Sequence, residues 1–148
     1  MKIYAWLTIA MLSLATSCPN KDEPCTNAGA SIDITGFDST EINRVTTYKY
    51  PPDGHFASIL DSTWVELRYG FQKGDTLFHS GLLESGFDYI VATSPAMKTW
   101  RITNFNLYPA IRKGYEHARC GIATYTVDDT PYSNLDLYNQ ETSIVLIR

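Results

Sequence analysis

The segment WVELRYGF at residues 64–71 alternates apolar and polar side chains in strict order. Its odd-numbered positions place apolar residues on one face of an extended chain, namely Val65, Leu67, Tyr69 and Phe71. Its other face carries Trp64, Glu66 and Arg68. A period of two indicates a half-buried β-strand, because successive side chains of a strand point to opposite faces. Gly70 marks a bulge or an end of this predicted strand.

Segments of the same character recur on both sides of this one. They lie at residues 32–34, 44–50, 76–78, 87–91, 99–108, 123–127 and 143–147, with a less regular one at 132–137. Turn-forming residues separate them, as in PPDG at 51–54 and in Asp128-Asp129. The apolar phase changes between Ile102 and Phe105, which predicts a bulge or a change of sheet. We expect an all-β antiparallel sandwich or barrel of about eight or nine short strands, with single helical turns at 38–42 and 81–85.

The N-terminus has the features of a secretory leader. Met1-Lys2 is followed by an apolar run over residues 3–15 that only Thr8 and Ser13 interrupt. This run is shorter than the roughly 20 residues that span a bilayer, and it fits the core of a signal peptide. The sequence ATSC at 15–18 resembles a lipobox, although Ala15 stands where Leu is more usual. The resemblance implies a signal peptide at 1–17 and an acyl membrane anchor on Cys18. The alternative is ordinary cleavage near residue 17.

The residues after Cys18 are polar and include Lys21, Asp22 and Glu23. They resemble the export signal of surface lipoproteins in Bacteroidetes-type bacteria. That resemblance implies an outer-membrane lipoprotein that faces the cell exterior. A solvated tether on a periplasm-facing protein is the alternative. We expect the lipidated cysteine and tether to cover residues 18–30 and a single β domain to cover 31–148.

The chain has three cysteines, Cys18, Cys25 and Cys120. An odd number in a secreted chain indicates a free thiol or an intermolecular bond, and lipidation of Cys18 would leave an even pair. An oxidising compartment then favours a disulfide between Cys25 and Cys120 over two free thiols. No Cys-x-x-Cys occurs, so no redox or zinc motif is indicated.

Three stretches of the domain resemble the immunoglobulin-like or transthyretin-like sandwiches of small lipoproteins from the same bacterial group. They are GFDYIV at 86–91, WRITN at 100–104, and Cys120 leading into YTV at 125–127. The resemblance implies a Greek-key-type sandwich rather than a barrel. It implies no activity and no site residues, because such folds carry many unrelated functions.

Charge and motifs exclude several functions. The net charge is −4 and no basic cluster occurs, which argues against nucleic acid and against anionic lipid surfaces. We find no catalytic motif, metal motif or cofactor motif. The histidines at 55, 79 and 117 are expected at loops or strand ends. A calcium site formed by Asp128, Asp129 and Asp136 is a weaker interpretation than a hairpin turn at 128–129.

Aromatic residues form the one unusual feature. Trp64 lies on the polar face of its predicted strand, and Tyr48 and Tyr50 share a face of another. These rings are a candidate platform for a glycan or protein ligand, or else they pack under loops. We therefore expect a non-catalytic binding or adhesion module, or an accessory subunit of an envelope complex. The alternatives are a small surface hydrolase acting on glycans or peptides through two acids or a histidine, and a purely structural lipoprotein.

Overall fold

The computed structural model describes residues 25–52, 55–110, 119–133 and 142–148. Among these residues the chain forms nine β-strands and no helix, so nothing there could cross a membrane as a helix. The strands are β1 (Gly29–Thr35), β2 (Ile42–Tyr50), β3 (Asp61–Glu66), β4 (Leu77–Glu84), β5 (Asp88–Pro95), β6 (Thr99–Ala110), β7 (Arg119–Val127), β8 (Thr130–Ser133) and β9 (Thr142–Ile147).

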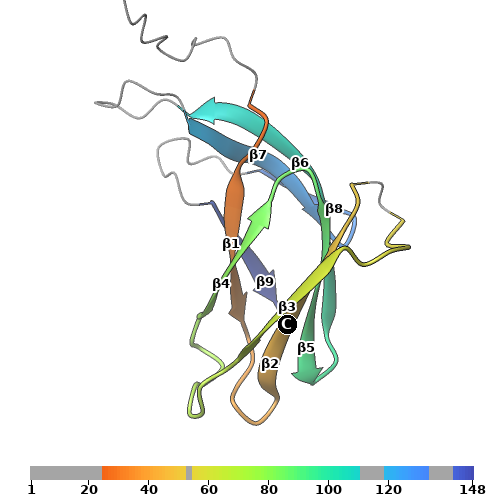
Figure 1. The fold of residues 1–148 in the computed structure, drawn as a ribbon. Helices are drawn as coiled ribbons and strands as arrows, with labels where there is room; N and C mark the ends of the chain where they lie inside the picture. Colours follow the sequence, from red (N-terminus) through yellow and green to blue (C-terminus); the bar gives the residue numbers. More distant parts are fainter. Residues whose placement is uncertain (1–24, 53–54, 111–118, 134–141) are drawn as a thin grey trace, which may run out of the picture.

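The strands form two sheets that pack together, and the predicted all-β sandwich is confirmed. The small sheet has the order β4-β1-β9, and the large sheet has the order β3-β2-β5-β6-β7-β8. Figure 1 shows β6 and β7 curving across the top of the molecule, above the small sheet. One pairing departs from the expected antiparallel pattern, because β1 and β9 run parallel.

Strands β2 to β5 form the Greek-key-type connection. The chain passes from β2 to β3 in the large sheet, crosses to β4 in the small sheet and returns to place β5 beside β2. The fourth strand thus lies next to the first, as this motif requires. Strands β5 to β8 then follow one another in space as they do in sequence.

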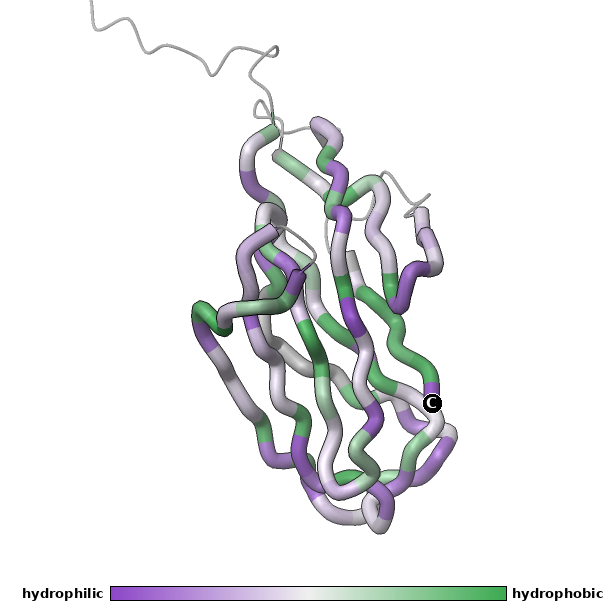
Figure 2. Tube along the Cα trace, turned by 90° about the vertical axis from the view of Figure 1, so that its right-hand side faces the viewer, coloured by the Kyte–Doolittle hydropathy of each residue, from purple (hydrophilic) through white to green (hydrophobic). Residues whose placement is uncertain are grey.

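The core lies between the inner faces of the two sheets. The small sheet contributes Ile32 and Ile144, and the large sheet contributes Val91 and Ile102, all fully buried. Each such side chain stabilises the fold by about 1.5–3 kcal/mol through burial. In Figure 2 the apolar run of β9 shows as green beside the C-terminus. Trp100 joins the sheets with a polar contact, because its indole N–H donates to the carbonyl of Ile147 at 3.2 Å.

The predicted strand over residues 64–71 is wrong in its bounds. β3 ends at Glu66, which pairs with Arg44 near the start of β2, and β2 offers little chain beyond that point. The chain then turns, with Gly70 at φ 94° and Tyr69 91% exposed. Alternation marks which side chains can share a face, but a strand ends where its partner ends. All six residues of β3 are exposed, because it is an edge strand paired only with β2.

Local predictions around the turns have mixed outcomes. At 38–42 the chain makes the expected helical turn, in which the Glu41 and Ile42 amides donate to the Asp38 carbonyl. Asp38 and Glu41 form a capping box, and hydrogen bonds from Thr40 lower the pKa of the Asp38 carboxyl. The turn expected at 81–85 is wrong, since residues up to Glu84 extend β4 and pair with β1.

A predicted bulge and a predicted hairpin turn are both confirmed. The pairing of β6 with β7 shifts register between Thr103 and Asn106, where a bulge was expected. Asp128 and Asp129 connect β7 to β8 with φ values of 46° and 65°. Two successive positive φ values at a two-residue connection are the geometry of a type I′ hairpin turn, which Asp tolerates better than most residues.

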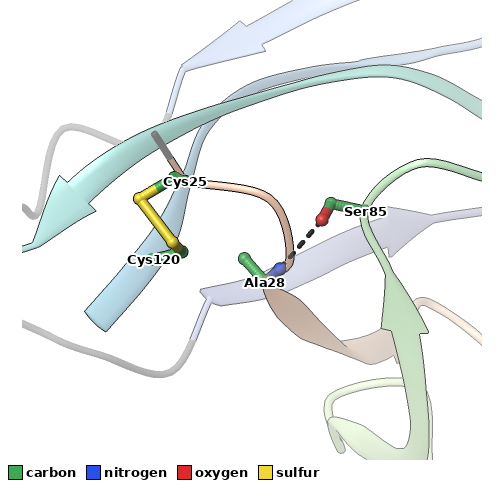
Figure 3. The surroundings of a disulfide bond; sticks show 4 residues. All are labelled: Cys25, Ala28, Ser85 and Cys120. Atoms are coloured by element: carbon green, nitrogen blue, oxygen red, sulfur yellow. Dashed lines mark hydrogen bonds between the residues drawn. A yellow bond between two sulfur atoms is a disulfide. The ribbon is translucent and has the colours of Figure 1, made fainter. Parts of the chain in front are cut away.

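The disulfide joins the two sheets at the N-terminal side of the domain (Figure 3). Cys25, just before β1, is bonded to Cys120 on β7, and their Cα atoms are 5.3 Å apart. Next to it, the Ala28 amide donates to the Ser85 hydroxyl at 2.8 Å, and the Ser85 amide donates back to the Ala28 carbonyl at 2.8 Å. The folded domain therefore starts before residue 31, and residues 25–30 of the expected tether belong to it.

Candidate functional site

The outer face of the large sheet is the surface from which the site is built. We define it as the face turned away from the small sheet. Because Tyr89 and Ile102 point into the core, their neighbours Asp88, Arg101 and Thr103 point to the outer face. No strand of the small sheet covers this face, so its side chains are available to a ligand unless loops shield them.

The predicted aromatic platform is only partly present on this face. Trp64 is 59% exposed, and the guanidinium carbon of Arg44 lies 5.0 Å from the centre of its ring. Tyr48 lies two residue pairs further along β2, opposite Ser62, and is half-buried. Tyr50 is only 6% exposed, because Phe56 packs edge-on against it with ring centres 5.1 Å apart. A platform that includes Tyr50 is therefore wrong, and Trp64 stands near the sheet edge with Arg44.

A larger feature lies beside Tyr50. It is a hollow of about 720 Å³ that four separate segments line. The β2–β3 connection supplies Pro52 and Phe56, the β4–β5 turn supplies residues 86–88, β6 supplies residue 101 and residues 103–106, and the β7–β8 turn supplies Asp129. This volume falls in the range of small-molecule binding sites. We call this feature the outer hollow.

Each of the four segments carries one lining residue with a left-handed backbone. The φ values are 49° at Phe56, 89° at Gly86, 57° at Asn104 and 65° at Asp129. Such conformations cost energy for residues other than glycine, least for Asn and Asp, and they concentrate at binding sites and turns. The fold therefore fixes the backbone conformation of one residue in each segment that lines the outer hollow.

Three phenylalanines are among the lining residues and each is held by a neighbour, while Phe87 and Phe105 also pack partly against the core. The Lys49 ammonium lies 3.8 Å from the ring centre of Phe87 and also pairs with Glu84 at 2.7 Å. The Arg101 guanidinium lies 5.6 Å from the ring centre of Phe56. Phe105 meets Tyr89 edge to face, with ring centres 6.2 Å apart. Rings fixed in this way lose little freedom when a ligand binds.

The polar lining offers mainly hydrogen-bond acceptors. The side-chain nitrogen of Asn104 donates to the hydroxyls of Thr103 and Thr126 at 3.2 and 3.4 Å. That of Asn106 donates to the Thr124 hydroxyl at 2.8 Å. Since these nitrogens are engaged within the sheet, the two amide oxygens remain to accept bonds from a ligand. The acids of the lining are Asp88, which is 4% exposed, and Asp129, which is exposed.

A second, smaller hollow of about 210 Å³ lies between the sheets on the side of β3 and β4. Its polar groups satisfy one another. The Tyr89 hydroxyl accepts from the Glu84 amide at 2.8 Å and donates to the Glu84 carbonyl at 3.2 Å, while Glu84 pairs with Lys49. Burial raises the pKa of Tyr89 to about 12. This network ties the sheets together and is not a candidate site.

The remaining predicted residues do not meet in a site. In the part of the chain that the structure describes, no three His, Cys, Asp or Glu side chains are grouped so as to hold a metal. His55 lies in the β2–β3 connection and His79 on β4. His117, Asp136, the predicted lipidation site Cys18 and the predicted export residues Lys21, Asp22 and Glu23 lie outside the described residues.

The sequence analysis missed the residues of the outer hollow, although it singled out several of their segments as turns or as a bulge. A phase change at residues 102–105 and the pairs Pro-Pro and Asp-Asp were visible signals. The resemblance to immunoglobulin-like or transthyretin-like domains stays a prediction. Comparison with known proteins found no matching family model, no matching curated protein and no matching solved structure.

Proposed function

We propose that this chain is a non-catalytic binding module, held on the outer membrane by an acyl anchor on Cys18. The outer hollow is the observation that carries the proposal. It combines three phenylalanines with a larger set of polar residues, among them Arg101, Asn104 and Asp129, which can orient a ligand through hydrogen bonds. An adhesion role or a place in an envelope complex follows from the same surface.

The lining favours binding over catalysis. Its described residues include no serine, cysteine, lysine or histidine, so they show no pair of a Ser, Cys or Lys nucleophile with a histidine base. The alternative is a glycan-processing hydrolase, and one observation favours it, because Asp88 and Asp129 line the same hollow. Asp88 is almost fully buried, however, and a general acid or base must reach the ligand.

Binding can be tested with a matched pair of arginine variants. Arg101 and Arg44 are both on the outer face, and each lies over an aromatic ring, but only Arg101 lines the outer hollow. Purified wild type, Arg101→Ala and Arg44→Ala are titrated calorimetrically with neutral oligosaccharides, acidic oligosaccharides and peptides. Binding that Arg101→Ala weakens and Arg44→Ala does not is the expected result. Equal binding by all three proteins contradicts the proposal.

The same incubations separate binding from hydrolysis. Mass spectrometry of the probes after prolonged contact with wild type is expected to show no cleavage products. Products that disappear in Asp129→Asn would favour the hydrolase. Protease shaving of intact cells tests the placement, since a domain on the outer surface is digested before the outer membrane is opened. Survival of the domain until that step places it in the periplasm.

A further inference from the structure

We propose that the ligand of the outer hollow is a neutral, hydroxyl-rich sugar. This inference rests on the proposed function and narrows it to one chemical class. Three properties of the lining support it, namely the placement of the rings, the excess of hydrogen-bond acceptors and the sign of the charge.

The rings provide the first argument. Phe56, Phe87 and Phe105 line the outer hollow from three segments and are half-buried, and Phe87 and Phe105 pack partly against the core. One face of a sugar ring presents C–H groups, which pack favourably against the electron-rich face of an aromatic ring. Walls of this kind suit a flat, partly apolar ring better than a flexible chain.

The acceptors provide the second argument. Among the described residues, the side-chain nitrogens of Asn104 and Asn106 donate to threonine hydroxyls and their side-chain oxygens accept no hydrogen bond. The carboxylate of Asp129 has no hydrogen bond or ion pair within the described part of the chain. Amide oxygens and carboxylates only accept, so they need a ligand rich in donors. Sugar hydroxyls are such donors, and each can also accept from the Arg101 guanidinium.

Charge provides the third argument, because it selects among sugars. Among the described residues the lining holds two acids, Asp88 and Asp129, and one cation, Arg101, whose guanidinium is already over the Phe56 ring. Uronic acids and sulfated sugars would bring further negative charge to this surface, which like-charge repulsion disfavours. The whole chain is also acidic, with a net charge of −4. Neutral sugars meet neither obstacle.

The two turn aspartates provide the test and its control. Asp129 lines the outer hollow and Asp128 does not, although both lie in the same turn with positive φ. Asn is tolerated in that conformation, and its amide oxygen can still accept the hydrogen bond that the Arg101 amide donates to Asp128 at 2.9 Å. Asp129→Asn and Asp128→Asn therefore remove the same charge and keep the turn. Wild type and both variants are screened on an array of neutral, uronic-acid and sulfated glycans, and the retained probes are then titrated in solution.

We expect wild type to retain neutral glycans only. Asp129→Asn should weaken that binding about tenfold or more, as expected when a charged acceptor is lost, and Asp128→Asn should change it less than about twofold. Equal or tighter binding of acidic glycans overturns the inference, as does an equal effect of the two variants. It is also overturned if only peptides bind, but the proposed function stands if Arg101→Ala abolishes that binding. If no probe of any class binds, both proposals fall.

Discussion

The disulfide between Cys25 and Cys120 is the perturbation whose effect on stability can be worked out most directly. The two residues are 95 positions apart, so the bond closes most of the domain into one loop. In the chain-entropy model a loop near this length raises the free energy of the unfolded chain by about 4.7 kcal/mol at 25 °C. Because a small domain has a total stability of about 5–15 kcal/mol, loss of the bond should remove a large share of it.

The double variant Cys25→Ala/Cys120→Ala measures this effect by urea denaturation of the purified protein. At a typical slope of about 1–3 kcal/mol per molar urea, the transition midpoint should fall by about 2 M. The slope itself should rise slightly, because an unfolded chain without the bond exposes more surface. Wild type treated with a reductant is the control, and its midpoint should fall to that of the double variant. The double variant should not respond to the reductant.

A loss below about 1 kcal/mol would refute the loop-entropy reasoning. Equal slopes and equal midpoints for wild type and the double variant would refute this reasoning as well. Either result would mean that contacts such as those of Ala28 with Ser85 order the N-terminal segment even in the unfolded chain, or that they hold it in the folded domain without the disulfide.

Three further outcomes are expected. Wild type should lose stability relative to Tyr89→Phe as the pH rises from about 10 to about 12, since the fold raises the pKa of Tyr89 to about 12 and so favours its neutral form, and urea midpoints across that range measure the difference. Ile102→Ala should lower the free energy of unfolding by about 2–5 kcal/mol because that side chain is fully buried, whereas Ile147→Ala, whose side chain is 65% exposed, should change it by about 0.5 kcal/mol or less. Cys18→Ala should abolish acylation and leave the precursor uncleaved, and normal maturation in mass spectrometry would contradict the lipobox interpretation.

The elements that could be predicted from the sequence were those fixed by local chemistry. Asp128-Asp129 has the residue type that a hairpin turn requires, and the structure places both at positive φ. The capping turn at Asp38 and the bulge after Ile102 are equally local. β3 failed the same reasoning because its end depends on where β2 begins, which the segment at 64–71 does not encode. The parallel pair of β1 and β9 joins the two ends of the chain, and no local pattern indicates it.

The residues of the outer hollow could not be predicted from the sequence for the same reason. Its walls come from four turns or bends that are distant in sequence, and only strand register brings Phe56 opposite Arg101. The exposed aromatic platform was predicted from alternation alone, which put Tyr48 and Tyr50 on one face of their strand and Trp64 on the polar face of another. Alternation could not show that the β2–β3 connection folds back so that Phe56 covers Tyr50.

The position of the disulfide has a mechanical consequence. Tension that enters through the residues before Cys25 does not have to travel through β1 and the hydrogen bonds of the small sheet. The covalent bond passes it directly to Cys120 on β7, which pairs with β6 from Ile102 to Ala110. The outer hollow lies on that same β6. If the chain is anchored through Cys18 and binds a ligand there as proposed, the load would pass along one covalent bond and one long strand pair, and the small sheet would carry little of it.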